Sequence, residues 1–247
     1  MPLTPSHAAA ALLLVRVLPR LPLAALVIGS MSPDFEYLLR LAPRGEFGHT
    51  STGLLVFCLP VGLVVWAIYR AWVRPVVLDL MPPGLAAGYA CGCNASWLGG
   101  ALAVLLGALS HVVWDAFTHA DGFFVAVLPA LASEALPSVF PGLRWYKLLQ
   151  HASTAVGAIA IVWLGLHWLR SHPPYARHFA PGQAKRAAAY LTLVVLVSCV
   201  GALLNGARAV DRGLAATLGY AAVGGMVGFA LASAALATCW RTAALTR

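Results

Sequence analysis

The sequence predicts an all-α polytopic membrane protein, a helix bundle with about five long transmembrane helices and a short broken helical hairpin at the N-terminus. Of its 247 residues, 61% are hydrophobic and only 10% are charged, which is too apolar for a soluble domain. Several apolar runs approach the roughly 20 residues that cross a bilayer as a helix. We find neither an internal repeat nor a soluble second domain in the pattern, so residues 1–247 are predicted to form a single integral membrane domain.

Two short apolar runs, residues 8–18 and 21–30, open the chain. Ser6 is the expected N-cap of the first run, and prolines separate the two. Neither run is long enough to span a bilayer alone. We therefore expect two half-helices packed inside the bundle, with a helix break at Pro33 after the second.

Five longer apolar runs follow, and each is predicted to span the membrane. They are residues 53–69, 97–119, 148–169, 187–204 and 214–237. The connections at residues 70–96 and 120–146 are predicted to be loops because prolines and glycines interrupt them. The last two spans are rich in Gly and Ala and contain no His, Asp or Glu, which suits close packing in lipid. The domain thus divides into residues 1–170, which carry the polar residues discussed next, and two additional packing helices within residues 187–240.

The sequence contains 16 Lys and Arg residues and has a formal net charge of +8. In a membrane protein this charge indicates topology and attraction to lipid headgroups, and no basic cluster of the kind that binds nucleic acid accompanies it. The larger share of the basic residues gathers on one side of the predicted topology, which is therefore assigned to the cytoplasm. Asp34, His49, His119 and His151 then all fall at helix ends on the non-cytoplasmic side.

The stretch from Ser110 to His119 contains three side chains of the types that bind metal ions. His111, Asp115 and His119 are spaced four residues apart and so share one helix face, after an uncharged apolar segment. Ionisable groups in such a helix cost roughly 3 kcal/mol each at its centre, and a bound cation would offset that cost. His111 and Asp115 can bind one ion, whereas Asp115 can bridge to a second ion near His119. The alternative is a set of polar side chains that line helix–helix contacts.

Histidines and aspartates elsewhere in the first 170 residues extend this set. The candidate metal ligands are His7, Asp34, His49, His111, Asp115, His119 and His151. Imidazole and carboxylate without thiolate suit zinc, manganese or iron(II). The five cysteines are scattered, with no second pair beside Cys91 and Cys93, and are expected to be free thiols. His167, His172 and His178 are assigned no role.

Several of these motifs resemble a bacterial multispanning family known as a domain of unknown function. The motifs are Ser6-His7, Gly29-Ser30-Met31-Ser32-Pro33-Asp34, Gly48-His49-Thr50, Ser110 to His119, and Tyr146 to His151. The resemblance covers roughly residues 1–170 and implies an integral protein of the bacterial cytoplasmic (inner) membrane. The distribution of Lys and Arg described above places the site on the non-cytoplasmic side. The chain is more distantly similar to membrane-bound metal-dependent hydrolases of the YdjM type and, through them, to zinc-dependent phospholipase C.

The resemblance to phospholipase C implies a division of the ligands among two or three divalent ions, zinc by analogy and manganese or iron as alternatives. Asp115 would be shared by two ions, with His49 and His111 on one and His7 on the other, and Asp34 bridging them. His119 and His151 would hold a third ion. Ala155 stands where that enzyme has a glutamate, so either another acidic residue completes the third site or the third site is weak or empty.

From this we expect a membrane-embedded hydrolase of the phospholipase C or lipid phosphatase kind, with Asp34 and Asp115 as catalytic carboxylates. Its substrate would be an amphiphilic phosphoester, a lipid or polyprenyl phosphate, whose phosphate oxygens Lys147 and Arg44 can pair with. Those two side chains can instead be charges that anchor helix ends at the interface. The alternative function is a non-enzymatic membrane protein, either a transporter or metal conduit or a structural protein. The sequence leaves the oligomeric state open.

Overall fold

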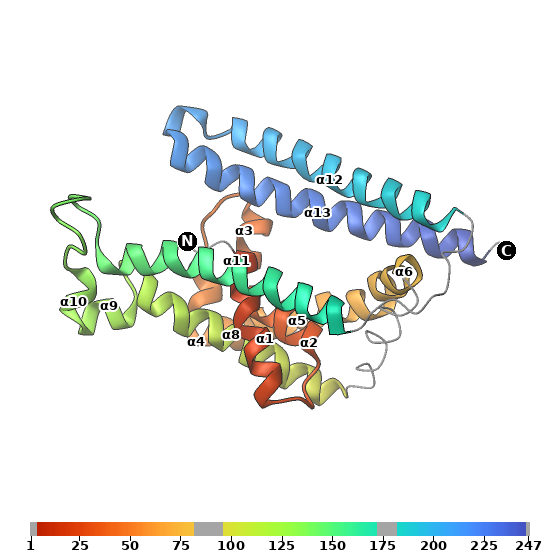
Figure 1. The fold of residues 1–247 in the computed structure, drawn as a ribbon, viewed down its shortest axis with the longest axis horizontal. Helices are drawn as coiled ribbons and strands as arrows, with labels where there is room; N and C mark the ends of the chain where they lie inside the picture. The colour runs from red at the N-terminus through yellow and green to blue at the C-terminus, as the bar shows by residue number, and fades with distance from the viewer. Residues whose placement is uncertain (1–3, 82–95, 172–181, 246–247) are drawn as a thin grey trace. The chain divides into compact units, whose positions relative to one another are not determined.

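The computed structural model describes residues 4–81, 96–171 and 182–245, and in these residues it is helical and contains no strand (Figure 1). Five helical segments are long and apolar enough to cross a membrane: Ser51–Leu80, Trp97–Val127, Trp145–Trp168, Lys185–Ala207 and Leu214–Trp240. The predicted all-α class and the five spans are thereby confirmed, and the chain has the make-up of an integral membrane protein. It divides into two compact units, which we describe separately.

The first unit comprises residues 1–34, 47–63 and 94–168. It begins with a 3-10 turn, η1 (Thr4–His7), and two short helices, α1 (Ala8–Val17) and α2 (Leu23–Met31), as the predicted broken hairpin requires. Ser6 does not cap α1, contrary to expectation. Its hydroxyl donates instead to the carbonyl of Thr154 in α11 (Trp145–Ser171), because η1 continues directly into α1 and leaves no extended cap residue.

The first span is longer than predicted. Its helical path runs through α4 (Ser51–Gly53), η4 (Leu54–Cys58), α5 (Leu59–Ile68), η5 (Tyr69–Val73) and α6 (Arg74–Leu80). Both η4 and η5 are π-helical turns, and each ends two residues before a proline, Pro60 or Pro75. A proline lacks the N–H that the preceding turn needs, and a wider turn absorbs this loss without ending the helix. The loop predicted for residues 70–96 therefore starts only after Leu80, and residues 82–95 lie outside the described part.

The central helix, α8 (Trp97–Thr118), lies where the sequence predicts it, with the Ser96 hydroxyl accepting from the Gly99 N–H as an N-cap. After it, the segment predicted to be a loop contains two short helices, α9 (Phe123–Val127) and α10 (Pro129–Ala132). Each is at most five residues long, too short to give a periodic apolar pattern that a sequence reading could detect.

Helices α2 and α8 pack with almost no space between their backbones. A Cβ atom on Gly107 of α8 would lie 2.3 Å from the carbonyl oxygen of Leu26, and one on Gly29 of α2 would lie 2.3 Å from that of Val104. Only glycine fits at such contacts, as in other helix pairs that meet through small residues. This contact fixes the end of α2 beside the polar end of α8.

The second unit comprises residues 35–46, 64–93 and 169–247. It contains α3 (Phe35–Arg40) and the long helices α12 (Gln183–Ala207) and α13 (Leu214–Leu245), which run side by side in Figure 1 and are joined through η6 (Val210–Arg212). The amide of Asn205, buried between them, donates to the carbonyls of Tyr220 and Leu41. None of the described candidate ligands lies in this unit.

Candidate metal centre

Five candidate ligands of the first unit converge from four separate segments. His111 and Asp115 lie one turn apart on α8, His7 ends η1, Asp34 ends η2 (Ser32–Asp34), and His49 ends η3 (Phe47–His49). We call these five residues the His/Asp cluster. Its members are far apart in the chain, so the fold and not the local sequence brings them together.

Four side-chain atoms of the cluster are linked by short distances. The Nε2 atoms of His49 and His111 are 3.3 Å apart. Asp34 Oδ1 lies 3.6 Å from each of these nitrogens. Asp115 Oδ2 lies 3.3 Å from that of His111 and 3.6 Å from that of His49. Ligands held tetrahedrally at about 2.0–2.1 Å from a zinc ion are about 3.3–3.4 Å from one another. The ligand atoms of Asp34, His49 and His111 all lie within 4.8 Å of one another, so these three residues have the spacing and the donor set that a divalent ion requires, and Asp115 Oδ2 lies beside both histidines.

Burial makes an empty cluster unfavourable. Asp34 is 1% exposed and Asp115 is 7% exposed, and a carboxylate taken out of water costs several kcal/mol unless it is paired. Within the described residues, Asp34 Oδ1 and Asp115 Oδ1 accept no hydrogen bond. Two carboxylates and two neutral imidazoles carry a charge of about −2, which one dication balances. The residues present therefore fit a divalent metal ion.

His111 is oriented for metal binding by the α2–α8 contact. Its Nδ1 lies 2.7 Å from the carbonyl oxygen of Ser30, which belongs to the last turn of α2, where carbonyls lack a helical partner. Since a carbonyl only accepts, Nδ1 carries a proton, and in the neutral ring Nε2 is the nitrogen left to bind an ion. Such a hydrogen bond to the outer nitrogen is the usual support of a metal-binding histidine.

His49 and Asp34 are brought together by a second close contact. A Cβ atom on Gly48 would lie 2.5 Å from the carbonyl oxygen of Pro33, so only glycine lets the two segments touch. Thr50 then caps the following helix by accepting from the Gly53 N–H at 2.9 Å. The hydroxyl of Thr4 donates to Asp34 Oδ2 at 2.5 Å, which leaves Oδ1 directed to the two histidines.

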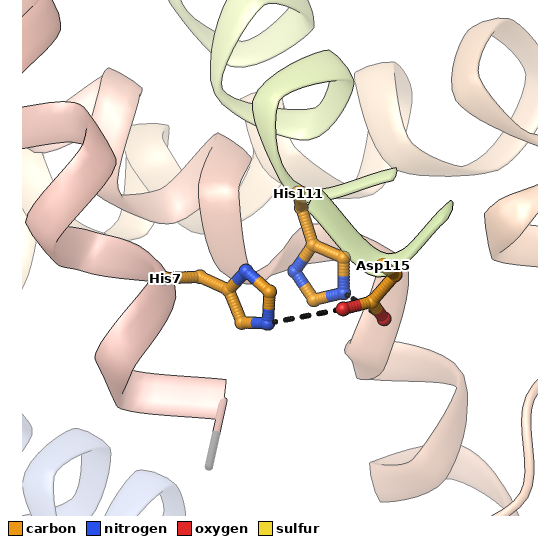
Figure 2. Close-up of side chains that lie close together, drawn as sticks. All are labelled: His7, His111 and Asp115. Carbon is orange, nitrogen blue, oxygen red and sulfur yellow. Dashed lines mark ion pairs between the residues drawn. The ribbon is translucent and has the colours of Figure 1, made fainter. Parts of the chain in front are cut away.

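His7 approaches the cluster from the opposite oxygen of Asp115, as Figure 2 shows. Its Nε2 lies 3.5 Å from Asp115 Oδ1, and its ring stacks on that of His111 with centroids 3.7 Å apart. Burial, with a smaller contribution from the neighbouring His111, lowers the pKa of His7 to about 3. The ring is therefore neutral at physiological pH, the form in which imidazole binds metals.

The stacking of His7 on His111 limits which residues can bind the same ion. A metal ion lies near the plane of the imidazole that binds it, and these two rings are stacked at an interplanar angle of only 18°. His7 and His111 would therefore hold different ions. Two groups of possible ligands can be formed, His7 with His111 and Asp115, and Asp34 with His49 and His111; the stacking favours assigning His111 to the second.

His119 contacts Asp115 but stands apart from both groups. Its Nδ1 lies 3.2 Å from the backbone oxygen of Asp115 and 3.6 Å from Asp115 Oδ2. Its Nε2 lies 3.3 Å from Nε2 of Gln150, whose oxygen accepts from Lys147 Nζ at 2.9 Å. The sequence interpretation missed Gln150, although a buried amide in a membrane span is itself a signal of function. Thr4 was also missed, and nothing in the local sequence marks it.

The structure does not bring His151 to the cluster. It is exposed on α11, as is Ala155, whereas Gln150 is 1% exposed. Successive helical residues point about 100° apart, so the turn that directs Gln150 inward directs His151 away. Arg44 belongs to the second unit, and its predicted role as a phosphate contact stays a prediction.

A family model described as Domain of unknown function (DUF4184) matches residues 1–238. No curated protein and no solved structure matches the chain. The resemblance to a multispanning domain of unknown function is thereby confirmed and extends beyond residue 170. The comparisons give no support to the more distant likeness to YdjM-type hydrolases and zinc-dependent phospholipase C.

Proposed function

The chain belongs to the DUF4184 family, and we propose that it is a membrane-embedded, metal-dependent hydrolase that acts on a phosphoester. The observation that carries the proposal is the set of four atoms from Asp34, His49, His111 and Asp115, with 3.3–3.6 Å between the measured pairs. We assign the first ion to Asp34, His49 and His111, whose ligand atoms lie within 4.8 Å of one another, with Asp115 Oδ2 beside them as a fourth donor. Zinc is the proposed metal because imidazole and carboxylate are among its usual ligands. Manganese and iron(II) accept the same donors.

A second ion is assigned to the outer side of Asp115. Asp115 Oδ1 and His7 Nε2 are buried, 3.5 Å apart, and directed at each other. Protein atoms alone would hold the first ion, as in structural sites, whereas His7 and Asp115 Oδ1 would leave the second position open to water and substrate, as in catalytic sites. A second dication also leaves the cluster with a charge of about +2, which favours an anionic substrate.

The chain's own residues perform three tasks in this scheme. When bound, a pair of divalent ions supplies a water of lowered pKa and neutralises charge on the phosphate. Asp115 holds the two positions together through its two oxygens, and Thr4 keeps Asp34 pointed at the first position. His7 stays neutral because burial lowers its pKa. Lys147, exposed and one turn before Gln150 on α11, is the proposed contact for a phosphate oxygen.

The proposed substrate is amphiphilic, a phospholipid or a polyprenyl phosphate. His49 lies just before the first span, and Asp115 lies in the last turn of α8, so both are near helix ends, the depth at which lipid headgroups are found. We place the protein in the bacterial cytoplasmic membrane with the cluster facing away from the cytoplasm, on the distribution of Lys and Arg.

This sidedness is tested with single cysteines at Arg44 and Arg177 in a cysteine-free background. A membrane-impermeant thiol reagent added to intact cells should label the Arg44→Cys protein, and the Arg177→Cys protein should react only after the cells are opened. Labelling of both positions from the same side would contradict the assigned orientation.

A second candidate function is metal binding without catalysis. Four protein atoms around the first position leave it no free coordination site, which is the arrangement of structural zinc. On this alternative the ion stabilises the fold of the first unit, and the pair of His7 and Asp115 Oδ1 contributes packing only.

Hydrolysis assays separate the two candidates. The detergent-solubilised protein, loaded with zinc or manganese, should release phosphate or a phosphorylated headgroup from at least one of phosphatidic acid, phosphatidylcholine and a polyprenyl phosphate. A chelator should stop the release and metal should restore it, whereas Asp34→Asn should be inactive and His167→Ala, on the same scaffold, fully active. A loaded protein that hydrolyses none of these lipids while keeping its metal would favour the non-catalytic function.

A further inference from the structure

We infer that His119 is a positioning residue and not a metal ligand. With Gln150 and Lys147 it forms a hydrogen-bonded chain that holds Asp115 in place at the proposed metal centre. The inference rests on the metal centre of the proposed function, and it reassigns a residue that sequence spacing places among the ligands.

All the hydrogen bonds along this series of side chains are donated in the same direction. Lys147 has only donors, so the atom it contacts at 2.9 Å must be the oxygen of the Gln150 amide. The amide nitrogen then faces His119 Nε2 at 3.3 Å and donates to it. An imidazole that accepts at Nε2 and is neutral carries its proton on Nδ1, and Nδ1 lies 3.2 Å from the backbone oxygen of Asp115. Every hydrogen bond therefore points from the surface towards Asp115.

This arrangement occupies both nitrogens of His119. Nε2 accepts from Gln150, and Nδ1 donates to Asp115, so no lone pair is left for an ion. In agreement, His119 is in neither group of possible ligands whose atoms lie within 4.8 Å of one another. Nδ1 also lies 3.6 Å from Asp115 Oδ2, so the ring packs beside the carboxylate that the proposed ions share.

Burial explains why Gln150 is needed. Its side chain lies in a membrane span and is 1% exposed, and an amide buried without hydrogen-bond partners is unfavourable. Lys147 pairs with the amide oxygen of Gln150, and His119 pairs with its amide nitrogen. The exposed ammonium of Lys147 polarises the amide and the imidazole in sequence, which makes Nδ1–H a stronger donor to Asp115. Outer hydrogen bonds of this kind typically change metal affinity about 10–100-fold.

Cobalt binding tests the inference, because Co²⁺ reports coordination by its visible absorption. Gln150→Leu and His119→Ala should bind the same number of Co²⁺ ions as the wild type, with an unchanged absorption spectrum and a Kd raised about 10–100-fold. Lys147→Met, at an exposed position that does not endanger folding, should raise the Kd by a smaller factor. His167→Ala on the same helix should leave the Kd unchanged.

Three results would overturn it. Loss of an ion or a changed absorption spectrum in His119→Ala would identify His119 as a ligand. A wild-type Kd in both Gln150→Leu and Lys147→Met would show that the hydrogen bonds from Lys147 through Gln150 to His119 do not affect metal affinity. A wild-type protein that binds no Co²⁺ would remove the metal centre itself, and with it both the proposed function and this inference; the first two results leave the metal centre standing.

Discussion

Replacing Asp115 by Asn is expected to abolish tight metal binding and, with it, metal-dependent hydrolysis. Asparagine keeps the volume but removes the negative charge that faces His49 and His111 through Oδ2 and His7 through Oδ1. Because both proposed ions depend on this carboxylate, the loss should exceed the 10–100-fold typical of an outer hydrogen-bond partner. We expect metal affinity to fall by more than about 100-fold on that scale.

The measurement is the metal content of the purified protein after dialysis against a weak chelator, together with its hydrolytic rate. Asp121→Asn is the matched control, since Asp121 is exposed just beyond the C-terminal end of α8 and should retain wild-type values. If Asp115→Asn kept full metal occupancy, the cluster would be a set of packing groups that line helix contacts.

Substituting Gly107 by Ala is expected to separate α2 from α8 and to disturb the metal centre from a distance. The added Cβ would lie 2.3 Å from the carbonyl oxygen of Leu26 and 2.6 Å from the backbone nitrogen of Ser30, and backbone atoms cannot rotate away. Overpacking of this kind typically costs about 1–3 kcal/mol. Movement of α2 also removes the Ser30 carbonyl from Nδ1 of His111, so metal affinity should fall together with stability.

Thermal unfolding in detergent and metal titration of the same preparation check this result. Gly165→Ala on α11 is the control, because no atom of the residues that the structure describes lies within 4 Å of the added Cβ. Alanine favours a helix by up to about 1 kcal/mol over glycine, so this variant should be at least as stable as the wild type. Equal midpoints for Gly107→Ala and Gly165→Ala would refute the account of the α2–α8 contact.

The part of the site that lies on one helix was predictable from sequence. His111 and Asp115 are four residues apart, and helical periodicity alone places them on one face. The spans were predictable for a related reason, since length and hydropathy are local properties. The continuation of the first span through residue 80 was not, because a proline such as Pro75 is read as a break although a π turn before it can absorb the missing N–H.

The convergence of Asp34 and His49 on His111 depends on contacts that spacing does not encode. It follows from the glycine contacts at Gly29, Gly48 and Gly107, which let backbones touch. The sequence also does not show which face of α11 is directed inward. A rotation of the helix by one residue would bury His151 in place of Gln150. By side-chain type alone, His151 was the better candidate for a metal ligand. In the structure it is the amide of Gln150 that is buried.

The most direct test of the metal centre is X-ray absorption spectroscopy of the wild-type protein at the edge of its bound metal. The account predicts an ion with nitrogen and oxygen neighbours at about 2.0–2.1 Å, a histidine contribution, and no sulfur neighbour near 2.3 Å. A protein that retains no stoichiometric metal after loading, or one whose metal is bound by sulfur, would contradict the assignment of Asp34, His49, His111 and Asp115 as the ligands.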